Sequence, residues 1–242
     1  MCRCIQSKSP LKGYVLIVPN DPTKGIVKCT CLEKRESDMH SRAGLSNSGL
    51  TERDLIYTPE DYLGVKSRRN LAFCEKFINE FGAYSGYIVY FYGAVGTQKS
   101  TVSRWIGATL IKQGRTVLYT SQQAIINNLM DFSQEKDWMK IYRTRDLLII
   151  DEVFDADKSV VYSTGNHLPH FDRLIRERHA SQKPILFISN IAPGDIDIKK
   201  FGSGLKDYMC RNLIYGNALE FKDNYVSELS GDRKTATDLF SF

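Results

Sequence analysis

Long apolar runs are missing from this chain of 242 residues. No stretch of roughly 18 or more apolar residues occurs, so the sequence predicts no membrane-spanning helix and no membrane partner. No secretory signal peptide precedes Cys2, so we expect a cytoplasmic protein in a reducing compartment. Internal repeats and low-complexity tracts are also absent, which argues against a repeat array.

The sequence has no large excess of either positive or negative charge. The chain has 33 Lys and Arg residues against 28 Asp and Glu residues, a net charge of +5. This balance permits contact with nucleic acid but does not by itself demonstrate it. With 42% hydrophobic residues, the chain can bury one full α/β core and a small appended module.

A glycine-containing loop, residues 93–100 (GAVGTQKS), follows an apolar run and precedes a helix-like segment. This order predicts a phosphate-binding loop, because backbone N–H groups at a helix N-terminus can surround an anion. Lys99 would reach the outer phosphates of ATP or ADP, and Ser100 would bind Mg²⁺. The predicted nucleotide-binding residues of this segment are Gly93, Ala94, Val95, Gly96, Thr97, Gln98, Lys99, Ser100 and Thr101.

The loop differs from the Walker A pattern G-x-x-x-x-G-K-[ST] at one position. Gln98 stands where the pattern has glycine. A side chain is tolerated there only if the backbone needs neither a positive φ nor a very close approach to phosphate. The possibilities therefore range from a working ATPase to a nucleotide-binding switch with slow turnover.

A continuous apolar run, residues 147–150 (LLII), ends in Asp151 and Glu152. Such a run is typical of a strand buried on both faces of a parallel sheet, and the acidic pair makes it a Walker B pattern. Asp151 would join the nucleotide site as a Mg²⁺ ligand, and Glu152 would polarise the attacking water. The alternative is a solvated acidic pair at a strand end, which the upstream loop makes less favoured.

A third apolar run, residues 184–190, ends in Asn190. An asparagine at this strand end can hydrogen-bond a γ-phosphate or orient water. The alternative is a turn-forming asparagine before the Ala-Pro-Gly sequence at 192–194. Because three strand ends would then point at one site, we favour the functional interpretation.

Together these motifs make residues 48–225 resemble the AAA+ ATPases, within them the DnaC/DnaI type of replicative helicase loader and the related IstB transposition helper. Segments 171–178 and 205–213 contribute to the resemblance. It implies an α/β P-loop fold with a five-stranded, mainly parallel sheet in the order 5-1-4-3-2, flanked by helices. The strands are predicted near residues 87–92, 115–119, 146–150, 185–189 and 217–221, and a helix over 70–81.

In that family an arginine projects into the ATP site of a neighbouring subunit, and the matching position here is Arg211. If this role carries over, the chain self-associates through the face that bears Arg211. Arg173, Arg176 and Arg178 are candidates for the same role or for subunit contacts. The alternative for Arg211 is a solvated surface side chain. Cys74 and Cys210, in helix-like apolar segments, are predicted to be buried.

The N-terminal region carries two cysteine pairs, Cys2 with Cys4 and Cys29 with Cys31, on either side of a predicted hairpin. Four thiolates can close a structural Zn²⁺ site, and so short a segment lacks the core to fold without such a staple. Disulfides and unligated cysteines are the alternatives, and the expected reducing compartment favours zinc. We therefore divide the chain into a Cys4 zinc-ribbon-like module at 1–32, a linker or short helix at 33–50, and an AAA+ domain with a short tail at 51–242.

The segment between the second and third strands mixes cations with aromatic side chains. In loaders and initiators the matching region touches single-stranded DNA, so Lys136 and Lys140 are predicted to bind DNA. The alternative is an amphipathic helix with Trp138 packed in the core, which is the favoured interpretation for that residue.

The resemblance implies an ATP-dependent loader that binds a hexameric replicative DNA helicase through its N-terminal module and delivers it to single-stranded DNA. The setting would be a bacterial or phage-infected bacterial cell. Two alternatives remain open. One is an IstB-type transposition helper, and the other is a non-hydrolysing, nucleotide-gated scaffold in which Gln98 has disabled catalysis.

Overall fold

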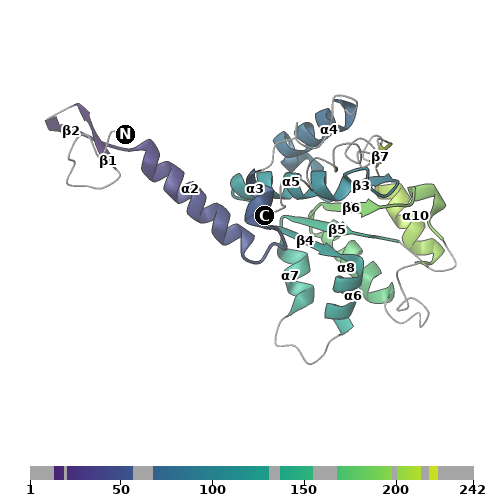
Figure 1. Cartoon of the computed structure of the whole chain (residues 1–242). Coiled ribbons are helices and arrows are strands. Elements are labelled where there is room, and N and C mark those ends of the chain that lie inside the picture. Colours follow the sequence, from purple (N-terminus) through teal and green to yellow (C-terminus); the bar gives the residue numbers. More distant parts are fainter. Residues whose placement is uncertain are drawn as a thin grey trace, which may run out of the picture.

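The computed structural model describes residues 14–18, 21–56, 68–130, 137–154, 168–197, 201–213 and 218–222. An α/β body forms most of this part of the chain, and a helical arm with a small hairpin extends from one side of it (Figure 1). No helix within these ranges is long and apolar enough to cross a membrane.

The body is built on one five-stranded sheet. Its strands are β3 (Ile88–Gly93), β4 (Val117–Ser121), β5 (Leu147–Asp151), β6 (Ile185–Ser189) and β7 (Ala218–Phe221). They lie in the order β4-β5-β6-β3-β7, and every neighbouring pair is parallel. Counted along these five strands and from the β7 edge, the order is 5-1-4-3-2, which confirms the predicted topology.

Alternate residues of the strands feed two separate cores, as the two-residue period of a strand requires. Val89, Phe91 and Ile149 face the first core. This core is covered by α4 (Arg68–Asn79), η3 (Phe81–Tyr84) and α5 (Lys99–Lys112). Tyr90 and Ile150 face the second core. It is covered by α6 (Gln122–Met130), α7 (Trp138–Thr144), α8 (Leu168–Ala180) and α10 (Ser203–Asn212). Burial on both faces explains why the central strands read as continuous apolar runs.

The helix predicted over 70–81 is present as α4, and η3 follows it. Phe77 and Cys74 are fully buried in the first core, which confirms the expected packing role of Cys74. The same expectation was wrong for Cys210, whose side chain is exposed. The reason is the helix face: α10 turns Leu205 and Met209 toward the second core, and Cys210 follows Met209 by one residue.

The arm is the helix α2 (Thr30–Leu45), which links the hairpin to the body (Figure 1). Its C-terminal end is anchored on α5, because Leu45 is buried in the first core. Gly44 lies so close to α5 that a Cβ there would be 2.7 Å from Ile111 Cγ2. The hairpin pairs β1 (Tyr14–Val18) with β2 (Asp21–Lys28) in antiparallel fashion, as predicted.

Two short elements complete the described part of the chain. They are α3 (Glu52–Ile56), which packs on α5, and the 3₁₀ turn η5 (Pro193–Asp195). The predicted boundary at residue 32 lies inside α2. The division of the chain into module, linker and AAA+ domain stays a prediction.

Candidate functional site

A pocket of about 370 Å³ opens at the carboxyl ends of the central strands, where open α/β sheets bind ligands. It brings together the loop after β3, the acidic pair at the end of β5 and the asparagine after β6. The lining residues are Val95, Gly96, Gln98, Lys99, Ser100, Thr101, Asp151, Glu152, Ile188, Ser189 and Asn190. The three predicted strand ends therefore meet at one site, since they sit on neighbouring parallel strands.

The loop between β3 and α5 depends on glycine at its first position. Gly93 has φ +143°, and a Cβ there would lie 2.1 Å from the carbonyl oxygen of Phe221 on β7. Gly96 also has a positive φ, 85°. Only glycine takes the first position without moving the neighbouring strand. Both glycines therefore adopt backbone angles that other residues take only with strain.

Gln98 adopts a left-handed backbone, with φ 68° and ψ 14°. This conformation is the one that the Walker A glycine would supply freely, and it costs a glutamine residue roughly 1–2 kcal/mol. The backbone at this position therefore does need the positive φ that makes glycine the preferred residue. Gln98 is the N-cap of α5, and its side chain makes no capping hydrogen bond.

The Lys99 side chain is held inside the loop. It is only 6% exposed, and its Nζ donates hydrogen bonds to the carbonyl oxygens of Gly93 at 2.8 Å and Ala94 at 2.7 Å. Burial lowers the pKa of Lys99, and the charge of Asp151 opposes that shift. The first turn of α5 contains no acidic residue and has no side-chain cap. A buried ammonium and uncapped helix N–H groups together favour an anion at this position.

The acidic pair consists of Asp151, the last residue of β5, and Glu152 in the strained turn that follows. Glu152 is exposed with φ 55°, and Phe154 has φ 62°. Three hydrogen bonds hold the turn in place: Val153 N to Ile188 O at 3.0 Å, Ser189 Oγ to Val153 O at 2.7 Å, and Phe154 N to Gln122 Oε1 at 2.8 Å. Strained backbone persists only where its surroundings over-determine it, as they do here.

Asp151 has a fixed donor at each carboxylate oxygen. Its Oδ1 accepts a hydrogen bond from the backbone N–H of Glu152 at 2.8 Å, and its Oδ2 accepts one from the Tyr119 hydroxyl. Burial raises the pKa of Tyr119, and the charge of Asp151 raises it further, so the hydroxyl stays protonated and donates. Sequence reasoning missed Tyr119. The available signal was its position near the end of the second predicted strand, at the same sheet edge as Asp151.

The predicted trans-acting arginine does not belong to this pocket. Arg211 is exposed near the C-terminal end of α10 and is not among the lining residues. Arg173 pairs with Glu177 at 2.7 Å, and Arg176 pairs with Asp172 at 2.8 Å. A role in trans for Arg211 therefore requires a second copy of the chain.

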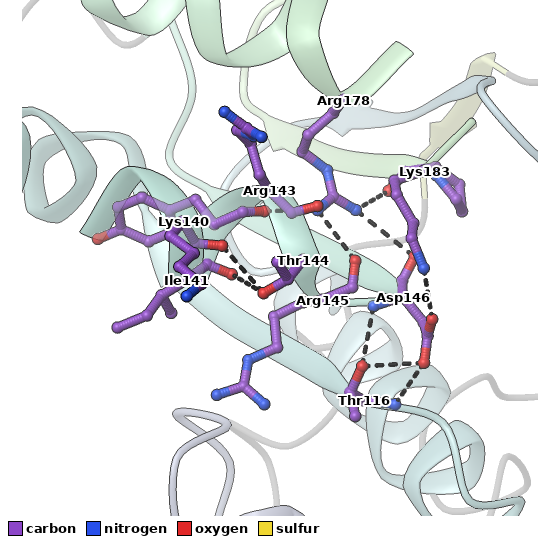
Figure 2. Close-up of polar contacts among 11 residues, drawn as sticks. Thr116, Lys140, Ile141, Arg143, Thr144, Arg145, Asp146, Arg178 and Lys183 are labelled. Carbon is purple, nitrogen blue, oxygen red and sulfur yellow. Dashed lines mark hydrogen bonds and ion pairs between the residues drawn. The ribbon is translucent and has the colours of Figure 1, made fainter. Parts of the chain in front are cut away.

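Arg178 was wrong as a candidate for a subunit contact, because it is fully buried. Figure 2 shows its guanidinium directed at backbone carbonyl groups at the end of α7 and before β6. Its acceptors include the carbonyl oxygens of Tyr142 at 2.5 Å, Arg145 at 3.0 Å and Pro184 at 2.7 Å. Desolvation lowers the pKa of Arg178 to about 9, with the charge of Asp146 acting in the opposite direction. The charged guanidinium therefore links the end of α7 to the segment before β6, and we call Arg178 with these carbonyl groups the clasp.

The predicted zinc and DNA sites are only partly within the described residues. Cys29 is buried at the N-cap of α2 and Cys31 lies in its first turn, whereas Cys2 and Cys4 lie outside the described residues. Within the described ranges, no cluster of three or more His, Cys, Asp and Glu side chains could hold a metal ion. The Cys4 site therefore stays a prediction, with only half of its ligands in view.

Of the two predicted DNA-binding lysines, Lys140 is exposed on α7 and Lys136 lies outside the described residues. Trp138 stacks on Tyr142, with 5.7 Å between ring centroids, and packs against the second core. The core interpretation of Trp138 is thereby confirmed.

The architecture is shared with solved structures at low sequence identity. A DNA replication initiation factor matches with a TM-score of 0.62 and 17% identity, over 79% of this chain and 56% of that chain. The replication initiator DnaA bound to AMPPCP and single-stranded DNA matches with 0.58 and 20%, over 77% and 57%. A DnaC helicase loader matches with 0.53 and 16%, over 71% and 99%.

This chain thus spans little more than half the length of the first two structures. No protein-family model matches the sequence, and a comparison with curated proteins found no significant match. With its five-stranded parallel sheet flanked by helices and its strand order, the chain has the AAA+ P-loop fold.

Proposed function

We propose that this chain is an ATP-dependent helicase loader, which binds a hexameric replicative DNA helicase and delivers it to single-stranded DNA. The observation that carries the proposal is the pocket, which unites the loop of Lys99, the acidic pair and Asn190 on an AAA+ sheet. The fold of a solved DnaC helicase loader supports it further.

The pocket suits a nucleotide with Mg²⁺. The Ser100 hydroxyl and the Asp151 carboxylate offer the oxygen ligands that Mg²⁺ prefers, and both line the pocket. Lys99 and the N-terminus of α5 would bind the phosphates, with Gly93 to Thr101 forming the loop around them. When bound, Mg²⁺ would neutralise charge on the β- and γ-phosphates.

The remaining side chains would act on the attacking water and on the neighbouring subunit. Glu152 is exposed in the pocket and would accept a proton from the water, while Asn190 would orient that water or hold the γ-phosphate. Arg211, exposed on α10, would complete the site of a second copy. Self-association through the Arg211 face is therefore part of the proposal.

The hairpin and the arm are proposed to contact the helicase. Ile26 and Val27 are 47% and 51% exposed on β2, and Met39 is 64% exposed on α2. Exposed apolar side chains on a projecting element are available to a protein partner. A zinc ion on the four N-terminal cysteines would rigidify this module, and Lys136 and Lys140 would contact the DNA.

Native mass spectrometry of this protein mixed with a hexameric helicase, with and without ATP and Mg²⁺, tests the proposal. We expect a defined complex whose stoichiometry depends on ATP, and the same spectrum would report any bound zinc. Lack of a complex from a protein that binds ATP and duplex DNA would instead support an IstB-type transposition helper.

A second candidate function is the nucleotide-gated scaffold. The left-handed backbone of Gln98 favours it, since a side chain at this position of the loop both strains the backbone and lines the pocket. The two functions differ in ATP turnover, so comparing turnover of the wild type with that of Gln98→Gly distinguishes them.

A further inference from the structure

Tyr119 lies outside every motif that the sequence displays, yet its hydroxyl contacts Asp151 directly. The second oxygen of Asp151 is held by the backbone N–H of Glu152. The two donors approach different carboxylate oxygens and so fix the rotation of the Asp151 side chain. A neutral phenol achieves this without adding a positive charge that would compete with a cation.

The Tyr119 ring is itself in contact with α5. The Arg104 guanidinium on α5 stacks over it, 4.2 Å from the ring centroid. Arg104 also pairs with Asp54 of α3 at 3.5 Å. Asp54 is only 8% exposed and accepts hydrogen bonds from the backbone N–H and the hydroxyl of Thr51, both at 2.8 Å. Every member of this chain of contacts has a defined partner.

The backbone of the segment after the arm meets Tyr119 as well. The Tyr119 N–H donates to the carbonyl oxygen of Ser48 at 2.6 Å. Gly49 has φ +71°, and a Cβ there would lie 2.1 Å from the Tyr119 carbonyl oxygen. Residues 48–54 therefore press against the same residue that holds Asp151, through backbone contacts and through Arg104.

We propose that Tyr119 is a positioning residue for Asp151, and that it couples the nucleotide site to residues 48–54 at the base of the α2 arm. This inference rests on the proposed nucleotide site and specifies how that site communicates. A cation bound through the Asp151 carboxylate would change the hydrogen bond between Asp151 and Tyr119. Arg104 would transmit this change to Asp54. By thermodynamic linkage, the factor by which the bound cation changes the affinity of the arm for a partner equals the factor by which that partner changes the affinity for the cation.

The first test is the variant Tyr119→Phe, which keeps the ring under Arg104 and removes only the hydroxyl. The Mg²⁺ dependence of binding of a fluorescent ATP analogue is titrated, starting from metal-free buffer. We expect the Mg²⁺ concentration for half-saturation to rise about tenfold, the usual effect of losing an outer hydrogen-bond partner of a metal ligand. Binding of the analogue without Mg²⁺ should stay within about twofold, because the phosphates contact other groups.

Tyr142→Phe is the matched control. Tyr142 is a buried tyrosine whose hydroxyl accepts a hydrogen bond from Asn128 at 2.7 Å on the other side of the sheet. Tyr142→Phe also removes a hydroxyl, but it should leave the Mg²⁺ titration unchanged. Arg104→Met supplies a second variant that leaves the Tyr119 hydroxyl in place, and it should shift the Mg²⁺ titration in the same direction as Tyr119→Phe.

Hydrogen exchange tests the coupling itself. Addition of the ATP analogue with Mg²⁺ should slow amide exchange in residues 48–54 of the wild type, and this response should be lost in Tyr119→Phe. An unchanged Mg²⁺ titration in a folded Tyr119→Phe, or an exchange response equal to that of the wild type, would overturn the inference and leave the proposed function intact. A wild type that binds no nucleotide at all would overturn both.

Discussion

At the scale of single residues, backbone strain gathers around the pocket. Three of the four described non-glycine residues with positive φ lie at it or next to it: Gln98, Glu152 and Phe154. The fourth, Gln182, lies in the turn between α8 and β6. Such strain persists only where the surrounding structure over-determines it, and it tends to cluster at functional sites. Glu152 places a carboxylate in the pocket. Gln98, by contrast, occupies a position where glycine would be less strained.

Replacing Gln98 with glycine should raise ATP turnover. Glycine adopts the left-handed backbone freely and removes a side chain from the pocket lining. The steady-state rate of phosphate release measures the effect. Gln182→Gly is the matched control, because it relieves a similar φ of 56° far from the pocket and should leave turnover unchanged. Fast turnover by the wild type would reject the scaffold function.

Replacing Glu152 with glutamine should abolish turnover and preserve ATP binding. The amide cannot accept the proton of the attacking water, and loss of a general base costs roughly 10²- to 10⁴-fold in rate. Single-turnover kinetics and equilibrium binding of ATP separate the two effects. Glu80→Gln, at the exposed end of α4, serves as the control. Unchanged turnover would remove Glu152 from the catalytic role.

At the scale of elements, Arg178 joins α8 and the segment before β6 to the end of α7, which is more than 30 residues away in sequence. It lies on α8 and binds carbonyl groups at the end of α7 and in the segment before β6 (Figure 2). Asp146 lies beside it and is held by Thr116 and by Lys183, the latter at 2.7 Å. These polar contacts fix the ends of β5 and β6 that are opposite to the pocket.

Replacing Arg178 with methionine should lower the free energy of unfolding by about 3–5 kcal/mol. The change leaves several buried carbonyl groups without a donor, and each such group carries a desolvation cost. Urea unfolding followed by circular dichroism measures the loss. Arg173→Met removes an exposed arginine from the same helix and should cost less than about 1 kcal/mol. Equal stability of the two variants would contradict the clasp.

At the scale of the whole molecule, the chain presents two features on different sides. The α2 arm carries the hairpin away from the body, and α10 with Arg211 lies on another side of the sheet (Figure 1). A chain that holds a partner with its arm could therefore still stack through α10 on a second copy. The arrangement is the one that the proposed loader needs, because a head-to-tail contact between copies builds a ring or a spiral.

Replacing Arg211 with alanine should leave ATP binding intact and lower turnover by at least tenfold. The reason is that an arginine in trans stabilises charge only in the transition state of a neighbour's site. Turnover of the wild type should rise steeply with protein concentration, and the variant should lose that dependence. Arg69→Ala, on the exposed surface of α4, is the control. Concentration-independent turnover in the wild type would contradict a shared site.

Much of the fold and of the pocket could be predicted from the sequence, because the signals are local. The apolar runs identified five strands, and the residues directly after them identified the loop, the acidic pair and Asn190. A buried parallel strand must be apolar along its length, and its carboxyl end must meet its neighbours at one edge. The strand order came from the resemblance that these motifs support, since the runs themselves do not specify it.

What only the tertiary structure decided involves residues that are distant in sequence. The burial of Arg178 and the hydrogen bond from Tyr119 to Asp151 depend on contacts between separate elements. An isolated arginine or tyrosine in a sequence gives no indication of the carbonyl or carboxylate that it will contact. Such polar partners are chosen by packing, because a buried polar group must find a hydrogen bond wherever the fold brings one within reach.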